Sequence, residues 1–340
     1  MVPVRQKNGR IEGPRLLEDR YRRIFVSGGA GFIGSHLVDI LVSQGYEVTA
    51  YDNLSNGRME FIERNVGKPN FTFIRADMLD RARLIEAVRG HDLVWHLAAN
   101  TDIIGSHERP VRDLRDCVEA TFNMVEAMRQ CGIRDIVFSS TGAVYGSLCE
   151  ERAVSEDAGP LCPISGYAAG KIGSEAFICC YCHMYGLRGR IFRFGNVIGA
   201  RMTHGVIYDF INRLRESPHR LLIRGDGRQE KNYFLVEECI EGMAFGLLNA
   251  ELDEGNPCEI FNLGTDSVTP VTKIAQIVTE EMGLKNTRIV IEGTPRAWPG
   301  DQPRVHITVE KINRLGWKAR LSSDEAVRTA VRRMLGKEQG

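Results

Sequence analysis

The chain has 340 residues, enough for one large or two medium domains. Its 44 basic and 44 acidic side chains cancel, so net charge gives no reason to expect binding to nucleic acid or an anionic membrane. No apolar run reaches the ~18 residues that a membrane-spanning helix needs, and residues 1–20 lack the apolar core of a signal peptide. We therefore expect a mobile leader over 1–20 and a cytoplasmic protein without a membrane partner.

From residue 21 onward, short apolar runs alternate with amphipathic stretches. The runs are rich in Val, Ile and Phe and apolar on both faces, which is typical of strands in a buried parallel sheet. The stretches between them, such as 35–44 and 122–131, predict helices on both faces of that sheet. The predicted strands cover 23–29, 46–52, 71–77, 92–99, 135–140, 190–196 and 259–264. The predicted fold class is therefore α/β, a Rossmann-type doubly wound parallel sheet.

The pattern changes after residue 196, where helical stretches and polar, turn-rich loops replace the regular alternation. This change predicts a smaller C-terminal domain that binds the substrate. We assign 21–196 plus 233–265 to the nucleotide-binding domain and 197–232 plus 266–335 to the smaller one.

The segment VSGGAGFIGSH, residues 26–36, joins the first predicted strand to the first helix. Gly28, Gly31 and Gly34 follow the spacing G-x-x-G-x-x-G. Residues without Cβ permit a tight turn and a close approach to a diphosphate, and the helix N-terminus offers free N–H groups to it. The loop therefore predicts a dinucleotide-binding site.

Two carboxylates follow later strands. Asp52 ends the second strand, where a carboxylate binds the ribose hydroxyls of a dinucleotide and repels a 2′-phosphate. Asp52 therefore favours NAD over NADP, although it could instead form a turn before Asn53. Asp77 ends the third strand and is predicted either to reach the adenine or to cap a helix over 80–89.

Tyr167 and Lys171 lie four residues apart in SGYAAGK, so both project from one face of a predicted helix. An ammonium group near a tyrosine favours the phenolate and lowers the phenol pKa. The pair therefore predicts a general base that removes a proton from an alcohol.

Three of the nine cysteines cluster at Cys179, Cys180 and Cys182, followed by His183. A zinc site would need a second ligand pair at matching spacing, and none lies nearby. We predict no metal site and interpret these residues as reduced, packed thiols.

Taken together, these motifs resemble those of the extended short-chain dehydrogenase/reductases, in their nucleoside-diphosphate-sugar epimerase/dehydratase branch. The resemblance covers about residues 22–335. Besides the glycine loop and Asp52 it rests on HLAAN (96–100), SSTGAVYG (139–146), YAAGK (167–171), RFGNVIGAR (193–201), GDGRQEKNY (225–233) and FNLG (261–264).

The resemblance implies an NAD cofactor, a UDP-sugar substrate and a catalytic set of Thr141, Tyr167 and Lys171. Tyr167 would take the proton of the sugar 4-hydroxyl, Thr141 would hydrogen-bond that oxygen, and Lys171 would hold the nicotinamide ribose. The implied cofactor-binding residues are Gly28, Gly31, Phe32, Ile33, Asp52, Asn53, Ser55, Gly57, Asp77, Met78, Leu97, Ala98, Ala99, Tyr167 and Lys171. The implied substrate-binding residues are Thr101, Thr141, Arg193, Asn196, Lys231 and Arg304.

Some positions depart from the family pattern. Lys231 and Asn232 stand where an Arg-Asp pair is usual, and Trp298 stands where an Arg often holds the diphosphate, a role that Arg304 is predicted to fill. Gly170 and Cys117 replace a frequent Ser and a frequent Asn.

The reaction is predicted from the two residues after Thr141. The resembling 4,6-dehydratases carry an Asp-Glu pair there, and hexuronate decarboxylases carry a Glu at the second position. This chain has Gly142 and Ala143, which cannot move a proton. We therefore predict a 4-epimerase that oxidises C4, rotates the 4-keto sugar and reduces it again. The alternatives are a 4-ketoreductase or dehydrogenase and a non-catalytic NAD-sensing protein.

The sugar is predicted to be a UDP-glucose/UDP-galactose pair or a UDP-glucuronate/UDP-galacturonate pair. Arg193 would bind the C6 carboxylate in the second case, or would be a buried arginine that supports strand packing or the diphosphate. The resemblance also implies a homodimer built from segments around 112–131 and 166–185.

Overall fold

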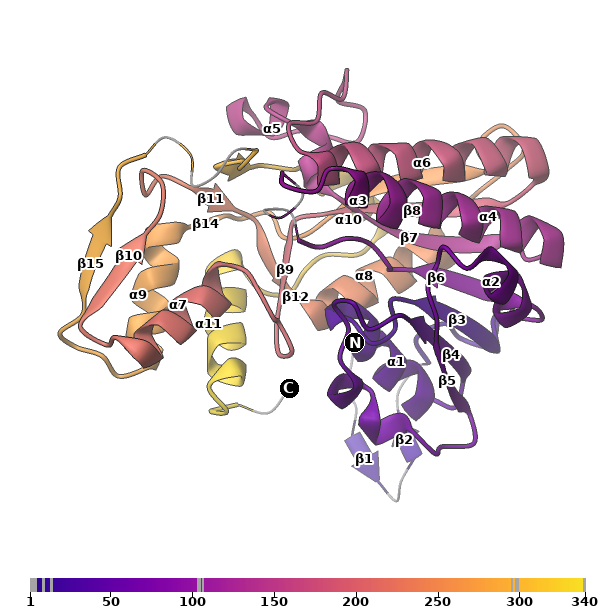
Figure 1. Cartoon of the computed structure of the whole chain (residues 1–340), viewed down its shortest axis with the longest axis horizontal. Coiled ribbons are helices and arrows are strands. Elements are labelled where there is room, and N and C mark those ends of the chain that lie inside the picture. Colours follow the sequence, from indigo (N-terminus) through magenta and orange to yellow (C-terminus); the bar gives the residue numbers. More distant parts are fainter. Residues whose placement is uncertain are drawn as a thin grey trace.

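The computed structural model describes residues 5–7, 10–12, 15–102, 105, 107–294, 296 and 300–338 (Figure 1). Within them, a seven-stranded parallel sheet has the strand order β13-β8-β7-β6-β3-β4-β5. Its strands are β3 (Arg23–Ser27), β4 (Glu47–Asp52), β5 (Phe71–Arg75), β6 (Leu93–His96), β7 (Asp135–Thr141), β8 (Arg188–Phe194) and β13 (Cys258–Leu263). The predicted fold class is thereby confirmed.

Successive side chains of these strands enter two separate cores. In β3, Ile24 and Val26 pack into the core on one face of the sheet, and Phe25 packs into the core on the other. This alternation follows from the twofold period of a strand. It explains why these strands carry apolar side chains on both faces, since both faces of the sheet are covered.

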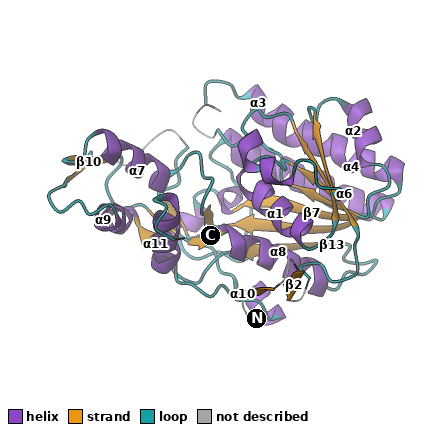
Figure 2. Cartoon of the chain, turned by 90° about the horizontal axis from the view of Figure 1, so that it is seen from below, coloured by secondary structure: helices purple, strands orange, loops and turns teal. Residues whose placement is uncertain are grey.

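Two groups of helices provide that cover, and they lie on opposite sides of the sheet in Figure 2. One face carries α1 (Phe32–Ser43), α8 (Val236–Asn249) and α10 (Glu310–Leu315). The other carries α2 (Arg81–Val88), α4 (Ala120–Cys131) and α6 (Gly166–Tyr185). A short α3 (Val111–Asp113) and a π-helical turn, η3 (Leu114–Glu119), lead into α4 and pack on α6.

The strand order reverses direction beside β3. From β3 the chain proceeds to β4 and β5 on one side and then crosses to β6 on the other. The loops that leave β3 and β6 lie side by side at the carboxyl ends of these strands, where the Leu97 nitrogen donates to the Ser27 carbonyl at 3.1 Å. Open parallel sheets bind their ligands at such a reversal point. The glycine loop and residues 97–102 both lie there.

A smaller lobe lies beside the sheet, at the left of Figure 1. Its core combines helices α7 (Val206–Glu216), α9 (Val271–Glu281) and α11 (Ser323–Met334) with strand β10 (Arg220–Ile223). Strand β15 (Arg288–Ile291) is mostly exposed and pairs with β10 in parallel. Short strand pairs connect the lobe to the sheet. They are β9 (Asn196–Ile198) with β12 (Tyr233–Leu235), and β11 (Glu230–Lys231) with β14 (Thr269–Pro270) and β16 (Arg304–Val305).

Short elements complete the chain. They are β1 (Arg5–Lys7), β2 (Arg10–Glu12), the 3-10 turns η1 (Met59–Phe61), η2 (Glu63–Asn65) and η4 (Gly142–Tyr145), and α5 (Leu148–Glu151). No helix in the described part of the chain is both long and apolar enough to cross a membrane.

The structure corrects the two ends of the predicted domain scheme. Within the predicted leader, Leu17 is fully buried and its N–H donates to the Tyr46 hydroxyl at 3.0 Å, so residues 15–20 pack on the sheet domain. Near the C-terminus, Ile312 and Trp317 enter the core under α8 rather than the smaller lobe. Both segments are amphipathic, and only the fold shows which apolar surface they cover.

We expect Leu17→Ala to lower the free energy of unfolding by about 2–5 kcal/mol, because it leaves a cavity in a closed core. Urea denaturation measures the change. Asp19→Ala in the same segment is the control, since Asp19 forms only an exposed ion pair with Arg15. Equal stabilities of the two variants would contradict the docking of this segment.

Candidate active site

The glycine loop folds as a tight turn between β3 and α1. Gly28 has a φ of +71°, and a Cβ on it would lie 2.8 Å from the backbone nitrogen of Ala98. A Cβ on Gly34 would overlap the carbonyl oxygen of Gly28. Gly31 begins α1 without a side-chain cap, so the N–H groups of Phe32 and Ile33 remain available to a ligand. The loop therefore leaves a space beside free backbone N–H groups, which suits an anion. Larger side chains in place of the glycines would fill this space.

Asp52 lies directly beside this space. Its carboxylate accepts hydrogen bonds from the backbone nitrogens of Ala30 at 3.0 Å and Leu54 at 2.8 Å. Burial raises the pKa of Asp52, and these two hydrogen bonds oppose the shift. A Cβ on Gly57 would lie 2.8 Å from the carboxylate, so the Gly57 backbone also borders this point.

The next cofactor candidates gather at the ends of β4 and β5. The Asn53 amide donates to Asp77 Oδ2 at 2.9 Å, and its oxygen accepts from the Ser55 nitrogen. Asp77 also accepts from the Leu79 nitrogen, whereas Asp80 caps α2. The alternative role of Asp77 as the cap of 80–89 is therefore wrong. Met78 is buried behind Asp77.

The structure brings Thr141, Tyr167 and Lys171 together. Ser165 caps α6 by accepting a hydrogen bond from the Ala168 nitrogen, so Tyr167 lies in the first turn and Lys171 in the second. The Lys171 ammonium lies 5.9 Å from the centre of the Tyr167 ring. A hydrogen bond links Tyr167 to Thr141, which ends β7.

The electrostatics differ from the prediction in one respect. Burial raises the pKa of Tyr167, with a contribution from Cys117, and the hydrogen bond with Thr141 only opposes this shift. The Lys171 ammonium donates to the Ser139 carbonyl at 2.6 Å, and burial lowers its own pKa. The expected lowering of the Tyr167 pKa is therefore wrong for the chain alone, since burial of the phenol is the largest influence on this pKa and raises it.

Two departures from the family pattern face each other beneath this site. A Cβ on Gly170 would lie 3.0 Å from Cys117 Cβ and 3.5 Å from its sulfur. Gly170 lies on α6 and Cys117 on the π-helical turn η3. The tightest contacts of such a Cβ would be with the Asp113 carbonyl oxygen at 2.9 Å and with Cys117 Cβ, so α6 packs closely against this turn at Gly170.

A buried hydrogen-bonded chain passes under the site, and the sequence analysis did not identify it. His96 Nδ1 lies 2.7 Å from Ser27 Oγ, and its Nε2 lies 3.0 Å from Thr121 Oγ1. Thr121 donates to Ser174 on α6. Complete burial, with the nearby Lys171 charge, lowers the pKa of His96 to about 3. A histidine within the apolar strand LVWH was the available signal for this chain of contacts.

Arg193 does not face a substrate, which corrects its predicted role. Its guanidinium donates to Glu175 at 2.7 Å, to the Tyr145 hydroxyl at 3.1 Å and to the Glu156 carbonyl at 3.2 Å. Only 4% of its side chain is exposed. Ser140 also donates to Glu175. Arg193 is therefore the centre of a buried network, in agreement with the packing alternative.

Lys231 and Arg304, both predicted to bind the diphosphate, lie on opposite faces of a short sheet. Lys231 pairs with Val305 and Arg304 pairs with Glu230 across β11 and β16. Because neighbours along a strand alternate in direction, Lys231 and Arg304 point oppositely. A Cβ on Gly142 would lie 3.1 Å from Val305 Cγ1. The face of the short sheet that carries Val305 and Lys231 is therefore directed toward the loop that follows Thr141. Arg304 is half-exposed and pairs with Glu230 at 3.5 Å, on the opposite face of this short sheet from Lys231.

The other substrate candidates have less defined surroundings. Asn196 opens β9 beside the sheet, and its backbone nitrogen donates to the Asn232 carbonyl at 2.7 Å. Lys231 lies 3.8 Å from the buried Asp301, and burial lowers its pKa. Thr101 is exposed after Leu97, Ala98 and Ala99. Trp298 lies outside the described residues.

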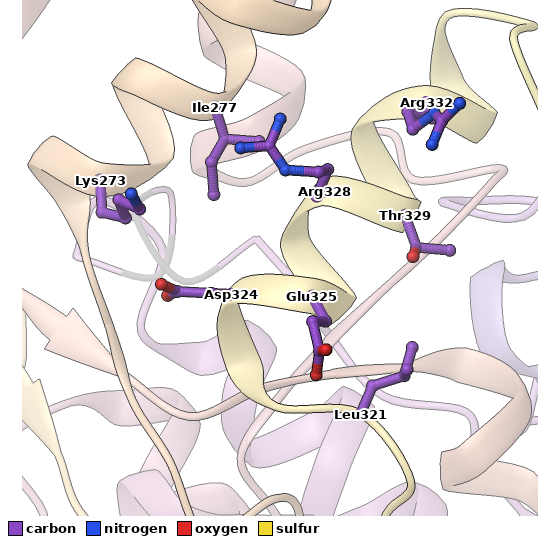
Figure 3. Close-up of a pocket in the computed structure, with 8 residues that line it drawn as sticks. All are labelled: Lys273, Ile277, Leu321, Asp324, Glu325, Arg328, Thr329 and Arg332. Carbon is purple, nitrogen blue, oxygen red and sulfur yellow. The ribbon is translucent and has the colours of Figure 1, made fainter.

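A second depression lies between α9 and α11, in the smaller lobe (Figure 3). Most of its charged side chains have partners that do not line it. Arg328 binds Glu280 at 2.8 Å and Glu281 at 2.7 Å, and Asp324 accepts from Thr269. This groove holds none of the residues described above and does not resemble a reaction site.

Comparisons with known proteins agree with this geometry. A model of the NAD dependent epimerase/dehydratase family matches residues 24–264. A Methanocaldococcus jannaschii protein with the provisional name UDP-glucose 4-epimerase is 34% identical, over 91% of this chain and 97% of the relative. A solved UDP-galactose 4-epimerase is 37% identical, over 94% of this chain and 100% of the other, with a TM-score of 0.80. Thermus thermophilus UDP-glucose 4-epimerase, solved with NAD, is 32% identical, over 93% and 100%, also with a TM-score of 0.80.

Relatives that catalyse other reactions match almost as well. Arabidopsis thaliana UDP-glucuronic acid decarboxylase 4 is 30% identical, over 95% of this chain and 70% of the relative. Mus musculus dTDP-D-glucose 4,6-dehydratase is 28% identical, over 91% and 88%. Similarity thus establishes the family and its NAD cofactor, whereas the choice among these reactions depends on individual side chains.

We expect Glu175→Gln to lower the free energy of unfolding by about 3–5 kcal/mol, because it leaves the buried Arg193 guanidinium without its counter-charge. Urea denaturation measures the loss. Arg304→Gln breaks a half-exposed ion pair and should have little effect. Similar losses in the two variants would contradict the central place of the Glu175–Arg193 pair.

Below pH 6.5 the unfolded chain protonates His96, whereas the folded chain, with a pKa of about 3, does not. The unfolded state therefore binds more protons, and stability falls as the pH falls, by about 1.4 kcal/mol per pH unit from this residue. We expect His96→Gln to remove this contribution to the pH dependence of the free energy of unfolding. Urea denaturation between pH 6.5 and 5 measures the change. Equal slopes for His96→Gln and the unchanged protein would contradict this explanation.

Proposed function

The chain belongs to the NAD-dependent epimerase/dehydratase family, and we propose that it is a UDP-sugar 4-epimerase. The observation that carries this proposal is the surroundings of position 142, directly after Thr141. Gly142 and the following Ala143 lack the further acid or base with which the resembling dehydratases and decarboxylases move protons at C5 or C6.

A side chain at position 142 would be crowded, and its neighbours would have to shift by a few tenths of an ångström to admit it. A Cβ on Gly142 would lie 3.1 Å from the Phe194 carbonyl oxygen and 3.1 Å from Val305 Cγ1. An aspartate there would press a carboxylate against a carbonyl oxygen and an apolar core. Ala143 follows with a methyl group only. The loop is therefore suited to a reaction that needs one acid-base residue at C4.

Tyr167 is that residue in our proposal. Its hydroxyl group takes the proton of the sugar 4-hydroxyl and later returns it, and Thr141 holds the reacting oxygen by a hydrogen bond. Lys171, held by the Ser139 carbonyl, orients the nicotinamide ribose. NAD, when bound, supplies the hydride acceptor and a positive charge that favours the phenolate of Tyr167.

The residues around the dinucleotide site fit NAD. The glycine loop leaves space for a diphosphate beside the start of α1, and Asp52 lies next to it with a buried carboxylate. Such a carboxylate suits ribose hydroxyls and opposes a 2′-phosphate. Asn53, Ser55 and Asp77 extend this polar edge toward the adenine.

For the sugar we propose the neutral UDP-glucose/UDP-galactose pair. Arg193, the residue that would bind a C6 carboxylate, is occupied by Glu175 and Tyr145, so the hexuronate alternative loses its main support. The two 4-epimerase structures above are named for these sugars. We assign the diphosphate to Lys231 and Asn196, because Arg304 points away from the Thr141 loop.

We also propose that two copies pair through α6 and η3. Val111, Leu114, Phe177, Met184 and Tyr185 are large apolar side chains that remain exposed on these neighbouring elements. Burying such a patch is favourable in water. We expect sedimentation to show a dimer that Leu114→Glu shifts toward the monomer. A monomeric unchanged protein at micromolar concentration would contradict the pairing.

The activity test uses the unchanged protein with UDP-glucose, UDP-galactose and the two UDP-hexuronates, with products resolved by NMR. We expect interconversion of the glucose and galactose forms without net accumulation of NADH. A 4-keto product with NADH would indicate the dehydrogenase alternative. A 4,6-dehydrated or decarboxylated product, or no reaction with any sugar, would contradict the proposal.

Tyr167→Phe should lower kcat by about 10²–10⁴-fold, because it removes the only proton carrier that we assign at C4. Tyr185→Phe, at the exposed end of the same helix, is the matched control and should retain activity. A non-catalytic NAD-sensing protein would show no turnover to lose, and full activity in Tyr167→Phe would refute the assigned role.

A further inference from the structure

Three cysteine thiols meet between α6 and the edge strand β13, and the proposed reaction does not use them. Cys179 Sγ lies 3.3 Å from Cys258 Sγ. Cys182, one turn after Cys179 on α6, reaches the same place, since a Cβ on Gly189 would lie 3.0 Å from its sulfur. A Cβ on Gly189, which pairs with Cys258 across β8 and β13, would lie 2.8 Å from the Cys258 sulfur. The missing side chain at Gly189 therefore provides the space for the sulfurs.

The helix divides the sequence cluster Cys179–His183 between two sides. Cys179 and Cys182 face the sheet, whereas Cys180 and His183 are exposed. This separation follows from the helical period. In the described part of the chain no group of three or more His, Cys, Asp or Glu is arranged to hold a metal ion. The close thiols call for a different explanation.

Their surroundings favour oxidation. Cys179 and Cys258 are half-buried, whereas Cys182 is fully buried. The hydrogen bond from the Cys258 thiol favours the Cys179 thiolate and lowers the pKa of Cys179. β13 has a neighbour on one side only, so a small oxidant can approach from the sheet edge. The sulfurs need to approach by only about 1.3 Å to reach disulfide length.

We propose that Cys179 and Cys258 form an oxidation site, at which a peroxide converts the two thiols into a disulfide that ties α6 to β13. The Cys179 thiolate attacks a peroxide oxygen, so that an S–O bond forms and the O–O bond breaks. The Cys258 sulfur then attacks the sulfenic acid, the S–S bond forms and the S–O bond breaks. Two thiols and one hydrogen peroxide thus yield one disulfide and two water molecules.

The disulfide would act on the helix that carries Tyr167 and Lys171. Cys179 lies one turn after Glu175, the partner of Arg193, so the link would fix α6 next to that ion pair. It would also close a long loop of the chain between residues 179 and 258. Such closure restricts the unfolded state, and we expect the thermal midpoint to rise by about 5 °C or more.

The test treats the full-length protein with hydrogen peroxide, blocks the remaining thiols with iodoacetamide and maps the peptides without reduction. We expect one cross-linked peptide pair containing Cys179 and Cys258, lighter by two hydrogens and separated by a reducing agent. Cys182→Ser and Cys180→Ser should retain the link and the higher thermal midpoint. Cys258→Ser should lose the cross-link and the rise in thermal midpoint. Cys258→Ala should give the same result, and its apolar side chain is better suited to this site.

Three results would overturn the inference. The first is free Cys179 and Cys258 under conditions that fully oxidise the exposed Cys162 and Cys180. The second is a cross-link between Cys182 and Cys258 in place of the proposed one. The third is a thermal midpoint that rises equally in oxidised Cys258→Ala. None of these readouts depends on the proposed epimerase activity.

Discussion

The buried ion pair between Glu175 and Arg193 is the interaction on which the arrangement of the site depends. Glu175 belongs to α6, one turn after Lys171, and Arg193 belongs to β8. The pair also reaches the end of β7 through Ser140 and the following loop through Tyr145. Two opposite charges are tolerated here because nearly every polar atom finds a partner.

The network continues from Tyr145 into the segments that cover the site. The Tyr145 hydroxyl donates to Asn262 Oδ1 at 2.7 Å, and the Asn262 amide donates to the carbonyls of Val154 and Thr308. One polar network therefore positions the catalytic helix, the Thr141 loop and the covering segments relative to the sheet. On the other side of α6, the chain through His96, Thr121 and Ser174 connects the same helix to the strand before the glycine loop.

The same packing restricts the chemistry. A Cβ on Gly142 would lie 3.1 Å from the Phe194 carbonyl oxygen and from Val305 Cγ1, so an acid at this position would require its neighbours to move. The resembling dehydratases carry an acid here, and the decarboxylases carry one at the next position, where this chain has Ala143. Relatives with such reactions share the fold at similar identity. The difference between family members is thus a matter of space and charge at a few positions and not of architecture.

Local pattern was sufficient to predict the strands, the glycine loop and the face shared by Tyr167 and Lys171. Each of these features depends on residues that are close together along the chain. Strands and helix faces repeat every two to four residues, and the glycine loop is a short motif between a strand and a helix. The resemblance to the family then indicated Thr141, which lies far from Tyr167 in sequence but hydrogen-bonds to it in the fold.

Other properties depend on contacts between distant segments, which no local pattern encodes. Glu175 and Tyr145 occupy the Arg193 guanidinium, which decides between its two predicted roles, and strand register places Lys231 and Arg304 on opposite faces. The burial of Leu17 and the contact between the thiols of Cys179 and Cys258 also depend on segments that are distant in the sequence. The sequence by itself determined the elements and the residue types at the strand ends. The tertiary structure decided which of those side chains meet, because burial and charge pairing act between residues that are neighbours only in the folded chain.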